Sequence, residues 1–321
     1  MSDAPAALGP GREFDVLRAA FARLAEQGAA SADLGDDCAL VPVGGTTLAL
    51  SIDLAVEGVH FRTDWLSFEE IGWRATAAAL SDLAAEGAEP IGVLVSVGSP
   101  GDAGKGKGDG GGPVAEIVAG AGAAVASVGG RVLGGDLVKS PHYLVDVCVL
   151  GHAPHPVRRA GAGAGDGVWV TGRLGGAGLA LAGLRAGVQP PAEILRRYAH
   201  PEPRIAAGRW LASHGATAML DISDGLAQDA GHLAAASGVA IEIAIEQVPC
   251  WPAVPPLAAA ASGEEFELLV TLPKDFAAAA DFTTSTGLPL TRIGWCAAGH
   301  GVRTTHHAAE VSISGYDHFA P

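Results

Sequence analysis

Short aspartate motifs recur along this chain, and most of them come directly after an apolar run. The run from Thr47 to Ile52 ends at Asp53, and the run AMLDIS contains Asp221 and is followed by Asp224. An apolar run that ends in this way is typical of a strand that leads into a loop. Carboxylate oxygens are the ligands that Mg²⁺ prefers. The pattern predicts an α/β chain with a magnesium-phosphate site at strand ends. The motifs are Gly35-Asp36-Asp37, Asp53, Ser81-Asp82, Gly134-Gly135-Asp136, Asp221 and Asp224.

A single aspartate of this kind is weak support for a site. Asp37, close to Gly35, is more often a turn former whose side chain caps its own backbone. Several aspartates at strand ends in both halves of the chain favour a shared site. Like charges that converge need a compensating cation, and Mg²⁺ that bridges carboxylates and phosphate oxygens suits phosphoryl transfer. No nucleophile motif such as GxSxG is present.

Composition and charge limit the class of protein. The 321 residues are 49% hydrophobic and 17% charged, as expected for a globular chain with two domains. The formal net charge of −15 argues against a nucleic-acid partner, because phosphate backbones bind basic surfaces. Four scattered cysteines without a CxxC pair indicate a reduced protein, and no signal peptide or membrane span is visible. We therefore expect a cytoplasmic protein with no membrane partner.

The first half contains the clearest helix signals. Ser67 and Glu70 form a capping box, and the helix that they open should end at Gly87. Asp82 falls on its alanine-rich, core-facing stripe with Ile71 and Ala75. An unpaired carboxylate there would be costly, so Asp82 needs a cation or several hydrogen-bond donors.

The segment 151–166 is rich in glycine, proline and alanine and separates two α/β-patterned halves. It predicts a domain boundary between an N-terminal domain, residues 12–150, and a C-terminal domain, residues 155–321. In the second half, a proline-rich connection is expected to reach about Pro203.

The glycine-rich stretch 101–112 lacks GxxxxGK[ST] spacing and is interpreted as a solvated linker, not a phosphate loop. Two histidine pairs are interpreted as solvated surface residues and not as a metal site, because no cysteine or carboxylate ligands accompany them. They are His152/His155 and His306/His307.

The order and spacing of the motifs resemble those of the thiamine-monophosphate kinase family, within the aminoimidazole-ribonucleotide-synthetase-like superfamily. The resemblance runs from about Glu13 to the C-terminus. Its motifs are Gly35 to Leu40, Ser51 to Asp53, Glu57 to Phe61, Leu80 to Ala85, Gly134 to Asp136, Arg159, Val170 to Gly172, Pro203-Arg204, Asp221 to Leu226 and Gly315 to Phe319.

The resemblance implies a two-domain synthetase-like fold, with a mixed sheet in the N-terminal domain and a homodimer formed through the N-terminal sheets. It implies ATP as co-substrate, thiamine monophosphate as acceptor, several Mg²⁺ ions, and direct in-line transfer to give thiamine diphosphate. The implied metal ligands are Asp37, Ser51, Ile52 (through its carbonyl), Asp53, Asp82, Asp136, Asp221 and Asp224, of which Asp53, Asp82 and Asp224 are the expected catalytic residues. The implied ATP contacts are Gly135, Asp136, Arg159 and Ser223, and the implied substrate contacts are His60, Glu264 and Tyr316.

Individual roles have simpler alternatives. Arg159 can bind phosphate through two donors, or can be a solvated arginine beside Arg158. His60 can be a structural histidine, and Tyr316 a C-terminal core anchor. One segment departs from the family pattern Gly-Gly-Glu-Asp-Tyr-Glu-Leu, since Glu265 and Phe266 replace Asp and Tyr. If this segment positions the thiamine end, the replacements are expected to alter affinity or acceptor choice.

Two other functions stay open. One is another ATP-using member of the superfamily with a different acceptor. The cysteines expected of selenophosphate synthetase or of the hydrogenase-maturation relative are absent, because the first cysteine is Cys38 and the chain ends in Pro321. The other is a nucleotide or metal sensor without turnover.

Overall fold

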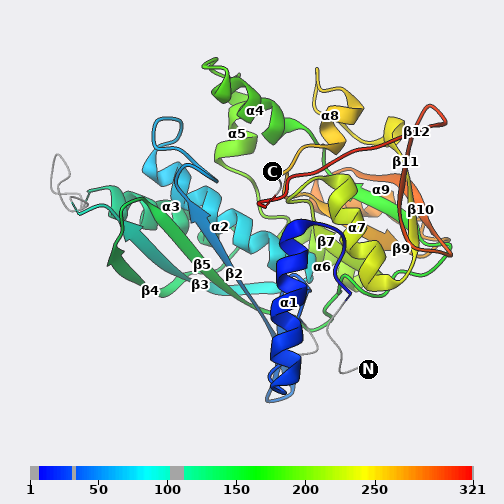
Figure 1. The fold of residues 1–321 in the computed structure, drawn as a ribbon, viewed down its shortest axis with the longest axis horizontal. Coiled ribbons are helices and arrows are strands. Elements are labelled where there is room, and N and C mark those ends of the chain that lie inside the picture. Colours follow the sequence, from blue (N-terminus) through cyan, green and yellow to red (C-terminus); the bar gives the residue numbers. More distant parts are fainter. Residues whose placement is uncertain (1–6, 31–33, 102–111, 320–321) are drawn as a thin grey trace.

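The computed structural model describes residues 7–30, 34–101 and 112–319. It contains two mixed sheets, each with its own helices, and Figure 1 shows them side by side. The expected two-domain α/β fold with a mixed N-terminal sheet is confirmed. Residues 102–111 of the predicted linker lie outside the described ranges. No helix within those ranges combines the length and apolar character that crossing a membrane requires.

The N-terminal sheet has the strand order β1-β2-β5-β3-β4. Only β3 and β4 pair in parallel, and the other neighbours are antiparallel. Its strands are β1 (Ala39–Val43), β2 (Thr46–Val56), β3 (Glu89–Ser99), β4 (Val132–Lys139) and β5 (Leu144–His152). Alternate residues of β5 are buried, as expected for a sheet with one covered face.

Two helices cover that face, α2 (Phe68–Ala85) and α3 (Gly112–Ser127). The capping box of Ser67 and Glu70 is present at the start of α2, as predicted. The helix also packs against the second half of the molecule. A Cβ atom on Gly208 would lie 1.9 Å from the carbonyl oxygen of Ala84, so only glycine allows this approach. Through this packing, α2 lies between the two sheets.

The C-terminal sheet has the order β12-β11-β8-β10-β6-β9-β7. Its strands are β6 (Gly167–Thr171), β7 (Ala218–Asp221), β8 (Ala240–Ala244), β9 (Leu268–Leu272), β10 (Leu290–Ala297), β11 (Gly301–His306) and β12 (Ala309–Val311). The remaining helices are α1 (Arg12–Glu26), α4 (Gly176–Arg185), α5 (Ala192–Ala199), α6 (Ile205–Ser213), α7 (Leu226–Ser237), α8 (Pro256–Ala260), α9 (Ala279–Thr286) and the 3-10 turn η1 (Ile245–Gln247).

Three local expectations were wrong. Asp53 does not end its strand, because β2 stays paired with β5 as far as Val56. Asp136 lies inside β4, which continues to Lys139 beside β3. The proline-rich connection contains α5, which begins directly after Pro191.

The outer face of the N-terminal sheet carries exposed apolar side chains. Ile52 is 65% exposed and Leu94 is 45% exposed, and both lie opposite Cys148 of β5. Such a contiguous apolar surface is typical of an interaction site.

Candidate active site

Three aspartates from distant parts of the chain meet beside α2. Asp37 precedes β1, Asp82 lies on α2, and Asp221 ends β7. One carboxylate oxygen from each lies within 4.8 Å of the other two. Asp37 and Asp221 are buried, and Asp82 is half-buried. The prediction that these carboxylates converge therefore agrees with the geometry.

Asp53 adds a further negative charge to this group. Burial and then the charges of Asp146 and Asp37 raise the pKa of Asp53 to about 6. Burial and then the charge of Asp37 raise the pKa of Asp221 to about 7. The pKa of Asp82 is raised well above its usual range by burial and then by Asp53 and Asp221. The cluster is thus electrostatically unfavourable without a cation.

Two serine hydroxyls orient these carboxylates. Ser51 Oγ donates to Asp82 Oδ2 at 2.5 Å, and Ser81 Oγ donates to Asp221 Oδ2 at 2.7 Å. Ser81 belongs to the Ser81-Asp82 motif, but no role of its own was predicted for it from the sequence. Ile52 lies on the opposite face of β2.

Arg159 is bound to the cluster and is not a solvated surface arginine. Its Nε and Nη2 donate to Asp37 Oδ1 at 3.1 and 2.5 Å, and its Nη1 donates to the Gly35 carbonyl at 3.2 Å. Burial alone would lower the pKa of Arg159, but the Asp37 carboxylate raises it above its ordinary value. The backbone N–H of Arg159 also binds Asp36 Oδ1 at 3.0 Å. These contacts hold one fixed positive charge beside the carboxylates.

The donor set suits Mg²⁺. All the clustered groups are hard oxygen ligands, which Mg²⁺ prefers. Asp37 Oδ2 is buried and has no hydrogen-bond partner among the described residues. A bound cation would satisfy this atom and the carboxylates around it.

The cluster lines a cavity of about 940 Å³. Its lining also includes His60, Ser223, Asp224, Glu264 and Tyr316, which were predicted as site residues. Nδ1 of His60 accepts a 3.1 Å hydrogen bond from the Val56 backbone N–H. Tyr316 is half exposed, so it is not a buried core anchor. The cavity therefore joins the acidic cluster to the residues expected at the acceptor end.

Gly135 and Asp136 do not line this cavity. Both lie on the exposed edge strand β4. A Cβ atom on Gly135 would lie 1.8 Å from the carbonyl oxygen of Val95, so close contact with β3 explains this glycine. Asp136 pairs with Ser96, whose register partner on β5 is Asp146.

Comparison with known proteins identifies the family. Residues 35–153 match "AIR synthase related protein, N-terminal domain", and residues 163–307 match "AIR synthase related protein, C-terminal domain". The thiamine-monophosphate kinase of Aquifex aeolicus is 33% identical over 300 residues, which cover 89% of this chain and 92% of that protein. The chain belongs to the thiamine-monophosphate kinase family.

Other family members agree with this assignment. The thiamine-monophosphate kinase of Mycobacterium tuberculosis is 36% identical over 214 residues, which are 65% of this chain and 62% of that protein. The chain thus spans less than two thirds of the length of that relative. A solved structure described as "AaThiL complexed with AMPPCP and TMP" superposes with a TM-score of 0.80 at 31% identity, covering 97% of this chain and 99% of the other.

The two replacements in the segment that departs from the thiamine-monophosphate kinase pattern lie in different places, because Glu265 is outside the cavity lining and Phe266 is part of it. Glu265 is buried, and its Oε1 accepts hydrogen bonds from Ser262 Oγ at 2.5 Å and from the Ala177 N–H of α4 at 3.1 Å. The side chain therefore caps α4. Phe266 lines the cavity beside Glu264, where the family has tyrosine.

Sequence reasoning missed Arg74 and Tyr198, which also line the cavity. Arg74 forms an ion pair with Glu264 and donates to the Tyr198 carbonyl at 2.5 Å. Its guanidinium lies 3.9 Å from the centroid of the Tyr198 ring. A charged residue two turns before Asp82 on the same helix was the signal that could have revealed Arg74.

Proposed function

We propose that this chain phosphorylates thiamine monophosphate with ATP and releases thiamine diphosphate and ADP. An oxygen of the acceptor phosphate attacks the γ-phosphorus in line, and the bond from that phosphorus to the departing ADP oxygen breaks. The observation that carries the proposal is that one cavity is lined both by the carboxylates of Asp37, Asp82 and Asp221 and by the expected acceptor contacts His60 and Glu264. The relative's complex with AMPPCP and TMP supports this choice of nucleotide and acceptor.

Magnesium is the proposed cofactor. Bound Mg²⁺ would neutralise the carboxylates and bind phosphate oxygens. The proposed ligands are Asp37, Asp53, Asp82, Asp221 and Asp224, with Ser51 orienting Asp82. Ile52 and Asp136 are left out of this set because neither lines the cavity in a single copy of the chain.

The chain's own residues position the two phosphates. Arg159, fixed on Asp37, holds a positive charge next to the carboxylates, where it can donate to a nucleotide phosphate. Ser223 lines the cavity next to Asp224 in the sequence. His60, Glu264 and Tyr316 are the proposed contacts of the thiamine end, with Arg74 holding Glu264 in place.

A product assay tests the proposal. The purified chain is incubated with ATP, Mg²⁺ and thiamine monophosphate, and thiamine diphosphate and ADP are quantified. Equal amounts of both are expected. Turnover with another phosphorylated acceptor alone would favour a different member of the superfamily, and ATP binding without product would favour a sensor.

We also propose that the outer apolar face of the N-terminal sheet, which includes Ile52 and Leu94, pairs with the same face of a second copy. A twofold interface buries the same patch on both partners, and this patch is otherwise open to water.

A further inference from the structure

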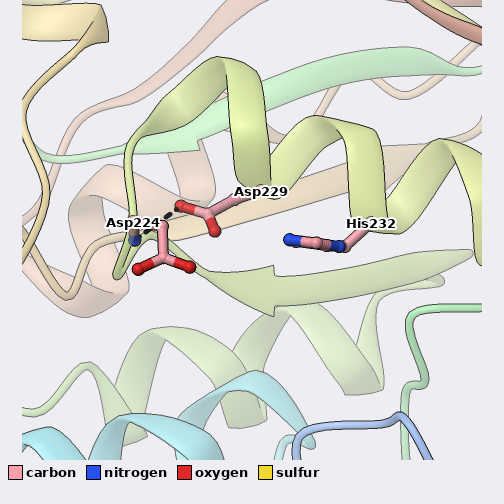
Figure 2. A group of neighbouring side chains, drawn as sticks. All are labelled: Asp224, Asp229 and His232. Carbon is pink, nitrogen blue, oxygen red and sulfur yellow. Dashed lines mark hydrogen bonds between the residues drawn. The ribbon is translucent and has the colours of Figure 1, made fainter. Parts of the chain in front are cut away.

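A second group of ligand-type side chains lies at the start of α7, next to the acidic cluster. Asp224 lies in the loop before the helix, Asp229 in its first turn and His232 one turn later. One ligand atom from each lies within 4.8 Å of the other two. Figure 2 shows the ring of His232 on the same side of α7 as Asp229, with both directed toward Asp224.

No hydrogen bond among the described residues accounts for the buried imidazole of His232. His232 is only 3% exposed, and neither ring nitrogen has a hydrogen-bond partner among the described residues. The ring of Phe14 lies 3.9 Å away, centroid to centroid, so α1 covers it. One ring nitrogen of a neutral imidazole carries a lone pair that can bind a metal ion, and His232 lines the cavity.

Helix capping accounts for only part of Asp229. Its Oδ2 accepts hydrogen bonds from the backbone N–H groups of Asp224 and Gly225, at 3.2 and 3.0 Å. Those contacts are typical of a carboxylate at a helix N-terminus. They leave the second oxygen of Asp229, and the whole imidazole of His232, without a role.

We propose that Asp224, Asp229 and His232 bind one divalent transition-metal ion, with His232 supplying an imidazole nitrogen. Mixed nitrogen and carboxylate ligands suit ions such as Mn²⁺ or Zn²⁺, whereas Mg²⁺ prefers oxygen alone. The site therefore differs in chemistry from the all-oxygen cluster of Asp37, Asp82 and Asp221, and Asp224, a proposed Mg²⁺ ligand, is the residue that the two metal sites would share. All three residues line the cavity, so solvent or a phosphate oxygen can reach the remaining coordination positions.

Pulsed electron paramagnetic resonance of bound Mn²⁺ tests the proposal, because ¹⁴N modulation of the echo reports a directly bound imidazole. The full chain is stripped of metal with a chelator, dialysed, and loaded with one equivalent of Mn²⁺ in excess Mg²⁺. Clear ¹⁴N modulation is expected, and it should disappear in His232→Gln. The matched control is His60→Gln, which alters another histidine of the same cavity and should keep the signal.

Absence of ¹⁴N modulation in the unaltered chain, or its persistence in His232→Gln, would overturn the proposal. Circular dichroism checks that each variant is folded. If His232→Gln does not fold, Asp229→Asn tests the site in its place, because the amide oxygen of asparagine can still cap α7. This variant should weaken Mn²⁺ binding by about tenfold or more, as measured by the amplitude of the ¹⁴N signal during Mn²⁺ titration. Unchanged affinity would refute the site. None of these measurements uses the acceptor, so they are independent of the proposed kinase activity.

Discussion

Arg159, in the segment that joins the two family domains, binds Asp37 of the N-terminal domain through two nitrogens, at 3.1 and 2.5 Å. The guanidinium shares Asp37 with a cluster that also contains Asp221, from the other sheet. The relative position of the two sheets therefore decides whether the cluster exists. Packing of α2 against both halves fixes that position.

Replacing one clustered carboxylate should remove activity and spare the fold. We expect Asp53→Asn and Asp82→Asn each to lower kcat by about 10²-fold or more, because each removes a proposed metal-ligand charge and little packing volume. Asp281→Asn, at an exposed position of α9, is the matched control and should behave like the unaltered chain. Near-normal turnover in both cluster variants would refute the ligand roles.

The cluster should also make the metal-free chain less stable as the pH rises. The folded-state pKa values of Asp53 and Asp221 are raised to about 6 and about 7, so the folded chain binds more protons than the unfolded chain between about pH 4 and 7. The free energy of unfolding should fall across that window. Denaturant titrations with a chelator present measure this fall.

Magnesium should reverse the loss of stability at pH 8, because it compensates the ionised carboxylates. Chelation should in turn abolish turnover while the far-ultraviolet circular dichroism stays native, since the core does not depend on the ion. Asp53→Asn should flatten the pH dependence. A metal-free stability that rises from pH 4 to 7 would contradict the assigned pKa shifts.

The planar guanidinium of Arg159 should contribute to ATP binding beyond its positive charge. Arg159→Lys keeps a positive charge but loses the planar pair of donors on Asp37. We expect kcat/KM for ATP to fall by about tenfold or more, as for other lost charge-assisted contacts to phosphate. Arg303→Lys is the control, because Arg303 forms an exposed ion pair with Glu242. Equal kcat/KM values for the two variants would argue against a role of Arg159 at the nucleotide.

The outer face of the N-terminal sheet should control assembly. A charge at Leu94 would be buried at a twofold interface, so Leu94→Asp should convert a dimer into a folded monomer. Light scattering coupled to size-exclusion chromatography measures the mass. Val188→Asp places the same charge at a position that is 62% exposed and far from this sheet in sequence, and it should stay dimeric. A monomeric unaltered chain would contradict the proposed interface.

Local patterns in the sequence predicted local features well. The capping box of Ser67 and Glu70 and the inward position of Asp82 depend only on residues a few turns apart. The position of Asp53 inside β2 depends on how far β5 extends beside it, which no local pattern reveals. The pairing of Arg74 with Glu264 joins residues 190 positions apart.

Histidine was also hard to interpret from sequence. A single histidine within an alanine-rich helix, such as His232, carries no visible sign that its nitrogens are unpaired. Its covered position depends on Phe14, which is far away in the sequence. The outward face of Asp136 likewise follows from the pairing of β4 with β3, not from the Gly-Gly-Asp motif itself.

Glu265 should act on stability and not on the acceptor. Its carboxylate binds Ser262 Oγ and the N-terminus of α4, so Glu265→Asp, which restores the family residue, would withdraw it by one methylene. We expect a loss of about 1–3 kcal/mol in the free energy of unfolding, as for a buried group that loses its partners. The KM for thiamine monophosphate should stay unchanged, whereas Glu264→Gln should raise it. Thermal unfolding and steady-state kinetics separate the two effects. A raised KM in folded Glu265→Asp would mean that this residue positions the acceptor after all.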